Sequence, residues 1–298
     1  MKLARLYQQY IWIVSKLQEH GRLTLAEMNR MWINEAVTQG NPLPRSTFNR
    51  HRDAILDMFG LIIDCDNQNR YFISNPNFVD DNSIERWMLS TLMVNVVLID
   101  SLSLKDRIML EDVPAGVEYL QIIIRAIKDK RKIKMVYQRF GSEAYEKVVS
   151  PVALKLSNRR WYLLVFTGKH MATYSLDRML SVSQTDEPSE MTDDFDAQQY
   201  FAEYYGVLTD GTPLEHIVLR AYGKTANYLR TLPLHSSQQE LTSGDDYTDF
   251  ALDIRPTKDF IGELLSHDEG LEVLEPESVR QKMKELLIAM TTRYQQEN

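Results

Sequence analysis

The chain has 298 residues, of which 44% are hydrophobic and 26% are charged, a composition that supports about two or three modest hydrophobic cores and excludes a wholly disordered protein. A single cysteine, Cys65, excludes an internal disulfide framework, and the first residues contain too short an apolar run for a signal peptide. The only membrane-like stretch, residues 87–99, is shorter than the roughly 18 apolar residues of a spanning helix, so we expect a multidomain cytoplasmic protein without a membrane segment.

The net charge of −8 would argue against a nucleic-acid partner only if it were evenly spread, and it is not. Residues 120–178 hold nine more bases than acids, whereas residues 179–219 hold nine acids and no lysine or arginine. A basic module therefore precedes an acidic connector. Solvated faces and helix caps would explain the same pattern, so the charge alone does not assign a partner.

Residues 1–80 are predicted to form a helical unit that ends in a hairpin. Apolar residues at helical spacing before a glycine indicate the first helix, and "TLAE" (Thr24–Glu27) is a capping box that opens the second. A third helix is expected over residues 45–60, capped by Ser46 or Thr47. Two short strands around the turn "DNQN" complete the unit.

The third helix carries the candidate DNA contacts. On a helical wheel Phe48, Ile55, Leu56 and Phe59 share one face, whereas polar side chains near the helix N-terminus point away from it. Three helices with a polar third helix and a two-stranded wing describe a winged helix-turn-helix domain, whose third helix enters the major groove of DNA. The expected contact residues are Arg45, Ser46, Thr47, Asn49 and Arg50.

Side-chain chemistry supports a DNA contact at this helix, because arginine pairs with guanine and asparagine with adenine. Solvated surface is the alternative interpretation of the same residues. Arg52 falls on the apolar side of the wheel, and for this residue we expect a local ion pair with Asp53 rather than a DNA contact.

Residues 81–120 are expected to form a helical linker without chemistry. From residue 121 a helix precedes several short strands, and five short strands after a helix suggest a small Sm-like β-barrel. Four segments of this region, "IKMVYQ", "SPVALK", "RRWYLL" and "YSLDRM", resemble the WYL domain, which is named for the tripeptide found here at residues 161–163. The resemblance places a ligand-sensing WYL barrel at residues 121–185.

The resemblance extends beyond the barrel, to a connector at residues 186–215 and an extension domain at residues 216–298. Alternating strands and helices in the extension predict an α+β sandwich with an antiparallel sheet, to which we assign dimerisation. The expected fold class of the whole chain is multidomain α+β. The resemblance implies a bacterial transcription regulator that binds a double-stranded DNA operator as a homodimer and senses an anionic ligand, a nucleotide or single-stranded nucleic acid, at the barrel.

The resemblance also indicates where that ligand binds. An arginine accompanied by hydroxyl donors is suited to a phosphate. Because side chains alternate along a strand, Trp161 and Leu163 are expected to pack inside the barrel, and Tyr162 and Leu164 to face the other way. The implied pocket positions are Tyr137, Ser150, Tyr162 and Arg178.

One position departs from the family pattern. Members commonly carry a further arginine where this chain has Ala172. Lys169 and His170, on the preceding turn, are candidates to replace its charge, although turn residues of this kind are usually solvated. Asp177 is expected to orient its neighbour Arg178.

The extension domain has its own basic cluster, for which we favour a solvated surface over contact with a partner subunit's ligand. Its members are Arg220, Lys224, Tyr228 and Arg230. The sequence lacks a glycine-rich phosphate loop, Cys or His pairs at metal spacing and a Gly-x-Ser-x-Gly elbow, so we expect no enzyme, cofactor or metal. Two alternatives stay open, a barrel that serves as a ligand-free dimerisation adaptor and an enzyme that processes nucleic acid.

Overall fold

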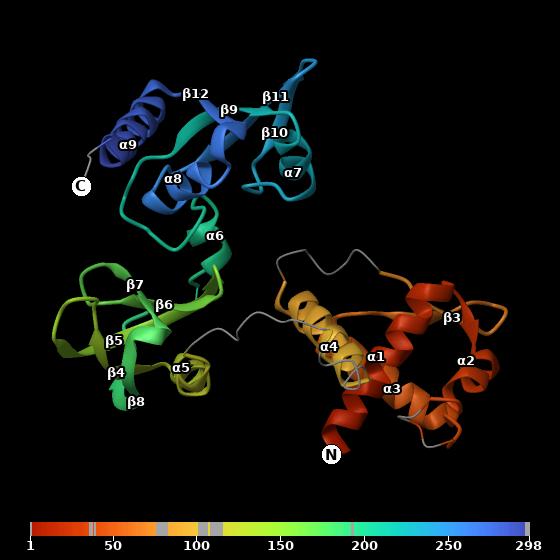
Figure 1. Ribbon diagram of the computed structural model, residues 1–298. Helices are drawn as coiled ribbons and strands as arrows, with labels where there is room; N and C mark the ends of the chain where they lie inside the picture. Colours follow the sequence, from red (N-terminus) through yellow and green to blue (C-terminus); the bar gives the residue numbers. More distant parts are fainter. Residues whose placement is uncertain are drawn as a thin grey trace. The chain divides into compact units, whose positions relative to one another are not determined.

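The computed structural model describes residues 2–35, 38, 40–75, 83–100, 107, 116–191 and 194–295. The chain divides into two compact units, Met1–Glu111 and Asp112–Asn298 (Figure 1). Among the described residues, no helix has both the length and the apolar content that a membrane span requires.

The first unit combines helices with a small antiparallel sheet. Its elements are α1 (Lys2–His20), β1 (Leu23–Thr24), α2 (Leu25–Trp32), α3 (Arg45–Phe59), β2 (Ile63–Cys65), β3 (Arg70–Ile73) and α4 (Ile84–Asp100). In the sheet, β3 lies between β1 and β2, so the hairpin is extended by the strand that separates α1 from α2. The long helix α4 packs against α1 and α3 (Figure 1).

The helix starts show how the local sequence sets these elements. The predicted capping box is confirmed, because Thr24 Oγ1 accepts from the Glu27 N–H at 3.2 Å and Glu27 Oε2 accepts from the Thr24 N–H at 2.8 Å. The predicted cap of α3 was wrong. Pro44 is the N-cap, and its carbonyl accepts the first helical hydrogen bond, from Phe48 at 2.9 Å, so the helix begins before either predicted cap residue, Ser46 or Thr47.

The buried face of α3 agrees with the wheel except at one position. Phe48, Ile55 and Phe59 are fully buried, whereas Leu56 is 46% exposed. The buried stripe instead includes His51, whose ring centroid lies 5.1 Å from that of Tyr10 on α1. The wheel was wrong for Leu56 because α1 covers the His51 side of α3.

Burial of His51 predicts a loss of stability in acid. Its ring is 3% exposed, and burial, with a smaller effect of Arg50, lowers its pKa to about 4. Since the unfolded chain takes up this proton near pH 6.5 and the folded unit does not, stability should fall by up to about 3 kcal/mol between pH 6.5 and pH 4, and be unaffected by His51 above pH 7. Urea unfolding of the wild type and His51→Phe at pH 7 and pH 5 gives the free energy of unfolding of each protein. An equal loss of stability in both proteins at pH 5 would contradict the role of His51.

The second unit begins with a helix that covers a five-stranded antiparallel sheet. Its elements are α5 (Leu120–Lys128), β4 (Arg131–Gln138), β5 (Ala144–Ser157), β6 (Arg160–Phe166), β7 (Met171–Ser175) and β8 (Met179–Pro188), with short 3-10 helices at Val117–Tyr119 and Leu176–Arg178. α5 packs against β4, β5 and β8 (Figure 1). Ile123 and Ala126 of α5 are fully buried in the core of this sheet, together with Leu163 and Val165 of β6.

Five strands after a helix were predicted, but the closed barrel is not found. The strand order is β7-β6-β5-β4-β8, and the fully described edge strands β7 and β8 do not pair with each other. β5 pairs with β4 through its first half and with β6 through its second, and a register shift between Pro151 and Ala153 bends it between the two. The 3-10 helix Leu176–Arg178 then directs the chain from one edge of the sheet to the other.

The rest of the second unit is a connector followed by a mixed domain. Its elements are α6 (Ala197–Phe201), β9 (Glu215–Tyr222), α7 (Thr225–Thr231), β10 (Gln239–Ser243), β11 (Tyr247–Ile254), α8 (Lys258–Leu265), β12 (Leu271–Glu275) and α9 (Glu277–Gln295), with a 3-10 turn at Asp268–Gly270. The antiparallel order β10-β11-β9-β12 confirms the expected α+β fold of this region. β10 was missed, because all its residues are exposed and show no apolar alternation.

A half-buried lysine joins the five-stranded sheet to the connector. Lys155 Nζ, on β5, donates to the Gly206 carbonyl at 2.6 Å and lies 4.2 Å from the centre of the Phe201 ring. Burial lowers the pKa of this lysine to about 8. Gly206 in turn packs against Asp259 of α8, whose Oδ2 accepts from the Val207 N–H at 2.8 Å.

The contact at Gly206 predicts a costly substitution. An added Cβ would lie 2.2 Å from Asp259 Oδ2, so Gly206→Ala should destabilise the second unit by about 1–3 kcal/mol through overpacking. Gly262 of α8 is the matched control, since a Cβ there meets nothing within 4 Å and alanine favours the helix. Thermal unfolding should give Gly206→Ala the lowest melting temperature of the wild type and the two variants. If Gly206→Ala were as stable as Gly262→Ala, Gly206 would not be held in a tight contact with Asp259.

Candidate functional site

The N-terminal end of α3 presents the five predicted DNA contacts. Four of them are exposed and Thr47 is half-buried; the exposed ones are Arg45, Ser46, Asn49 and Arg50. The exposed charged residues that follow on the helix, Asp53 and Asp57, are acidic and would repel phosphates. Only the first half of α3 therefore suits a nucleic acid, and a helix N-terminus also favours an anion.

Arg52 belongs to the packing of the first unit. Its guanidinium donates to the carbonyl of Ile63 on β2 and lies 5.4 Å from the centre of the Tyr71 ring on β3. The expected ion pair with Asp53 was wrong, because the helix turns Arg52 toward the hairpin. Arg52 thereby ties α3 to the strands.

The hairpin turn gathers two arginines around one carboxylate. Asp66 Oδ2 accepts from Arg22 Nη1 at 3.0 Å and from Arg70 Nε at 2.9 Å, while Oδ1 accepts from the backbone N–H groups of Gln68 and Arg70. These hydrogen bonds lower the pKa of Asp66 to about 2, and the largest effect comes from the backbone N–H of Arg70. The two arginine side chains are still 48% and 40% exposed and accessible to a phosphate. Sequence reasoning missed them, although an aspartate opening a turn is the signal for such a cluster.

Tyr137 and Arg178 lie together on the core face of the five-stranded sheet. Arg178 Cζ is 5.8 Å from the centre of the Tyr137 ring and 4.8 Å from that of Phe140. The Tyr137 and Tyr174 rings meet edge to face, with their centroids 4.8 Å apart. Burial raises the pKa of Tyr137, and the positive charge of Arg178 lowers it by a smaller amount. Arg178 Nε is buried and has no hydrogen-bond partner within the described residues.

Asp177 does not orient Arg178 as expected. It pairs with Arg160 Nη1 at 3.1 Å and accepts from the hydroxyl of Ser175. The two neighbours separate because consecutive side chains of the 3-10 helix Leu176–Arg178 point about 120° apart. Arg178 is thereby left over the aromatic rings.

The other predicted ligand residues are not brought to this cluster. Ser150 Oγ is buried and accepts from the Glu190 N–H at 3.0 Å. Tyr162 pairs in register with Lys155 and Ser175, on the face of β6 opposite Leu163.

Lys169 and His170 lie on a turn at the end of the same hairpin. Both side chains are exposed, and the His170 carbonyl accepts from Thr167 Oγ1 at 2.9 Å. The structure therefore unites Tyr137 with Arg178 and places the remaining four predicted residues elsewhere in the sheet.

Sequence reasoning missed several residues around the tyrosine rings that Arg178 contacts. Lys147 Nζ, on β5, donates to the Tyr174 hydroxyl at 3.2 Å, and Arg139 Cζ lies 5.8 Å from the centre of the Tyr145 ring. Tyr145 and Lys147 pair in register with the buried residues Tyr137 and Met135 of β4, which places them on the core face. The alternation of "YEKVV" is the signal that could have found them.

Comparison with known families decides what this sheet is. The WYL domain model matches residues 118–184, and the WCX domain model matches residues 213–291. The chain contains a WYL domain followed by a WCX domain. The WYL domain is the sheet that holds Tyr137 and Arg178, and the WCX domain is the α+β region after the connector.

Solved structures give weaker likenesses over longer spans. Proteasome accessory factor B/C (PafBC) of Arthrobacter aurescens is 18% identical with a TM-score of 0.36, and the match covers 94% of this chain and 46% of that one. A CRISPR Cas-related protein is 10% identical with a TM-score of 0.37, and the match covers 98% of this chain and 86% of that one. This chain thus spans less than half of the PafBC chain. Comparison with curated proteins found no match.

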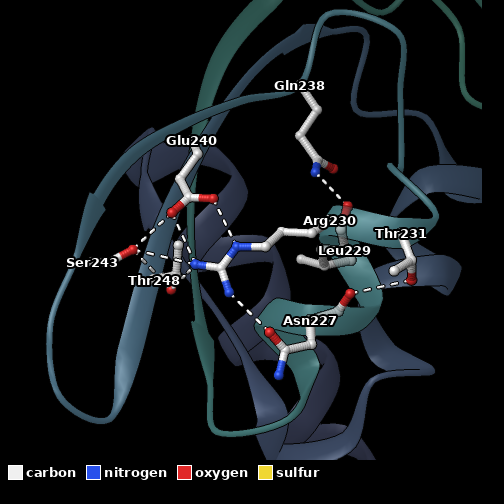
Figure 2. Close-up of polar contacts among 8 residues, drawn as sticks. All are labelled: Asn227, Leu229, Arg230, Thr231, Gln238, Glu240, Ser243 and Thr248. Carbon is white, nitrogen blue, oxygen red and sulfur yellow. Dashed lines mark hydrogen bonds and ion pairs between the residues drawn. The ribbon is translucent and has the colours of Figure 1, made fainter.

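The basic residues of the WCX domain are divided between ion pairs and surface. Figure 2 shows Arg230 of α7 making a two-point contact with Glu240, with Nε and Nη2 each 2.8 Å from a carboxylate oxygen, while Nη1 donates to Asn227. Arg230, followed by Ser243, lowers the pKa of Glu240 to about 2. Arg220 makes a similar contact with Asp249, whereas Lys224 and Tyr228 are exposed. The Nε and both Nη atoms of Arg230 are thus all engaged within the domain.

The last helix of the WCX domain leaves an apolar surface open. A groove of about 630 Å³ lies between α9 and β12, and Val279 is the buried residue of α9. The exposed apolar side chains of this helix are Leu286, Leu287, Ile288, Met290 and Tyr294. Such a surface is characteristic of a protein interface.

Proposed function

We propose that the protein is a transcription regulator that binds operator DNA through its first unit and senses an anionic ligand through its WYL domain. The observation that carries this proposal is the exposed N-terminal end of α3, where Arg45, Asn49 and Arg50 project from a helix whose other face is packed in a core. The strand order and the helices of this unit support a winged helix-turn-helix domain, with the hairpin β2–β3 as its wing.

In the proposed complex the first half of α3 lies in the major groove. Asn49 and Arg50 lie little more than one turn after the first helical residue, Arg45. They would reach base edges, with adenine and guanine as their respective preferred partners. Arg45 is placed for a phosphate at the helix N-terminus, and Arg22 and Arg70 for phosphates beside the wing. Asp53 and Asp57 limit how much of the helix approaches the DNA.

The ligand in this proposal is a nucleotide or a single strand of nucleic acid. Support comes from the WYL domain itself and from Arg178, which has a buried unpartnered Nε and stacks on Phe140. A phosphate satisfies an arginine, and an exposed ring such as Phe140, 76% accessible, offers a stacking surface for a base.

We further propose that the protein acts as a homodimer, with the exposed apolar side chains of α9 in the WCX domain as the favoured contact. A twofold protein reads a DNA site with two similar halves. Footprinting of genomic fragments with the purified full-length protein should therefore protect paired half-sites, and light scattering should give twice the mass of the 34.7 kDa chain. Protection of isolated half-sites by a monomer would contradict this arrangement.

A further inference from the structure

Three cations of the WYL domain lie over tyrosine rings of the sheet and meet no carboxylate in the described part of the chain, whereas three other bases of the domain are paired with acids. The paired bases are Lys132 with Glu190, Lys134 with Glu146 and Arg160 with Asp177, at 2.6, 2.8 and 3.1 Å. Arg139, Lys147 and Arg178 instead lie over the rings of Tyr145, Tyr174 and Tyr137, respectively, each 5.8 Å from the ring centre. A cation held on a ring without an acid keeps its charge available for an anion from outside.

Lys147 has a position that solvation does not explain. It is half-buried, it projects on the core face of β5, and its ammonium group is fixed 3.2 Å from the Tyr174 hydroxyl. A lysine that served only solubility would extend into water. Lys134 of β4 does so on the opposite face of the sheet, where it pairs with Glu146 of β5.

We infer that Lys147 is a second anion-binding residue of the WYL site, and that it acts with Arg178 on a ligand that carries two phosphate groups. The inference rests on the proposed function of that site. The two cations contact different rings of one edge-to-face pair, Tyr174 and Tyr137, whose centroids are 4.8 Å apart, so each serves its own phosphate.

Two buried polar atoms support a ligand of this size. Arg178 Nε and the Tyr145 hydroxyl have no hydrogen-bond partner among the described residues, and leaving such atoms unsatisfied is costly. Tyr145 lies beside Tyr137, with ring centroids 6.0 Å apart, and under the guanidinium of Arg139. A polar ligand that reached these rings would satisfy both atoms.

Two kinds of ligand carry two phosphates and a base. In a nucleoside diphosphate the phosphates are adjacent, whereas in a single-stranded dinucleotide with a 5′-phosphate a nucleoside separates them. Titration with thymidine monophosphate, thymidine diphosphate and pdTpdT at two salt concentrations distinguishes these sources, because each neutralised phosphate adds about −0.7 to the log–log salt slope on a single strand.

The test compares Lys147→Met with the wild type, with Lys147→Arg, and with Lys134→Met as a matched control on the opposite face. Lys147→Met should weaken whichever two-phosphate ligand binds by roughly tenfold and make its salt slope about 0.7 shallower, while thymidine monophosphate binding changes little. Lys147→Arg should retain the wild-type slope, and Lys134→Met should behave as wild type. Thermal unfolding of each variant confirms that it is folded.

Failure of this inference differs from failure of the proposed ligand site. If Arg178→Ala abolishes binding but Lys147→Met binds two-phosphate ligands with wild-type affinity and slope, Lys147 is not an anion contact and the site itself stands. An equal loss for one-phosphate and two-phosphate ligands would also overturn the assignment of a second phosphate. If neither substitution changes binding of any probe, the ligand site itself is refuted.

Discussion

Changing Asn49 and Arg50 together to alanine should weaken operator binding by about 2–6 kcal/mol, because each good base contact contributes roughly 1–3 kcal/mol. Both side chains are exposed on the first half of α3 and make no contribution to its buried face, so the variant should fold normally. Gel-shift titration of the double variant on the footprinted operator measures the loss. The salt dependence of the residual binding should stay close to that of nonspecific DNA.

The matched control for this prediction is Asp57→Asn, which changes an exposed residue on the far half of the same helix. It removes a negative charge near the DNA, so operator binding should be equal or tighter. Undiminished operator binding by the double variant would mean that another surface holds the DNA. A loss of the same size in Asp57→Asn would show that the helix as a whole, rather than its N-terminal end, was perturbed.

Arg178→Ala should weaken binding of a short fluorescent single strand to the WYL domain by roughly 10- to 150-fold, since hydrogen bonds to charged groups contribute about 1.5–3 kcal/mol. The loss of one phosphate contact should also make the log–log salt slope about 0.7 shallower. Operator binding by the first unit should persist, because Arg178 belongs to the second unit. Fluorescence titration of both proteins at two salt concentrations gives these values.

Equal affinities of the wild type and Arg178→Ala for the single strand would leave the stacked arginine a packing residue. The WYL domain would then be better explained as a dimerisation adaptor without a ligand. Arg160→Ala is a suitable control, because this arginine is paired with Asp177 and lies outside the aromatic cluster. It should bind the single strand as the wild type does.

Local patterns predicted the elements of this chain better than they predicted its site. The capping box of Thr24 and Glu27 depends on four consecutive residues and was found from sequence. The open arrangement of the WYL sheet depends instead on the bend of β5 near Pro151 and on the 3-10 helix Leu176–Arg178, neither of which leaves a periodic signal. The five strands could therefore be predicted, and their open arrangement could not.

The candidate ligand site shows the same limit. Tyr162 was chosen from the family pattern, yet its register with Lys155 puts it on the other face of the sheet from Tyr137. Lys147 was overlooked because a lone lysine that follows a glutamate resembles a solvated position. Which face of a strand turns inward is decided by its neighbours in the sheet, and a single sequence does not name those neighbours.

Charge patterning was informative only after pairing was known. The basic stretch 120–178 and the acidic stretch that follows it neutralise each other in part, since Lys132 contacts both Glu187 and Glu190. The net excess of bases therefore overstates the positive charge that the WYL domain offers to a ligand. What matters for the proposal is the smaller set of cations that lie over tyrosine rings of the sheet and meet no acid among the described residues, Arg139, Lys147 and Arg178.

We propose that this chain couples ligand binding at the WYL domain to operator binding at the first unit. The most direct measurement is the operator affinity of the full-length protein with and without a saturating short single strand, in the wild type and in Arg178→Ala. We expect the single strand to change the operator affinity of the wild type by about 5- to 150-fold, the usual range of allosteric coupling, and to leave that of Arg178→Ala unchanged. Operator affinity that is the same with and without the bound strand in the wild-type protein would contradict it.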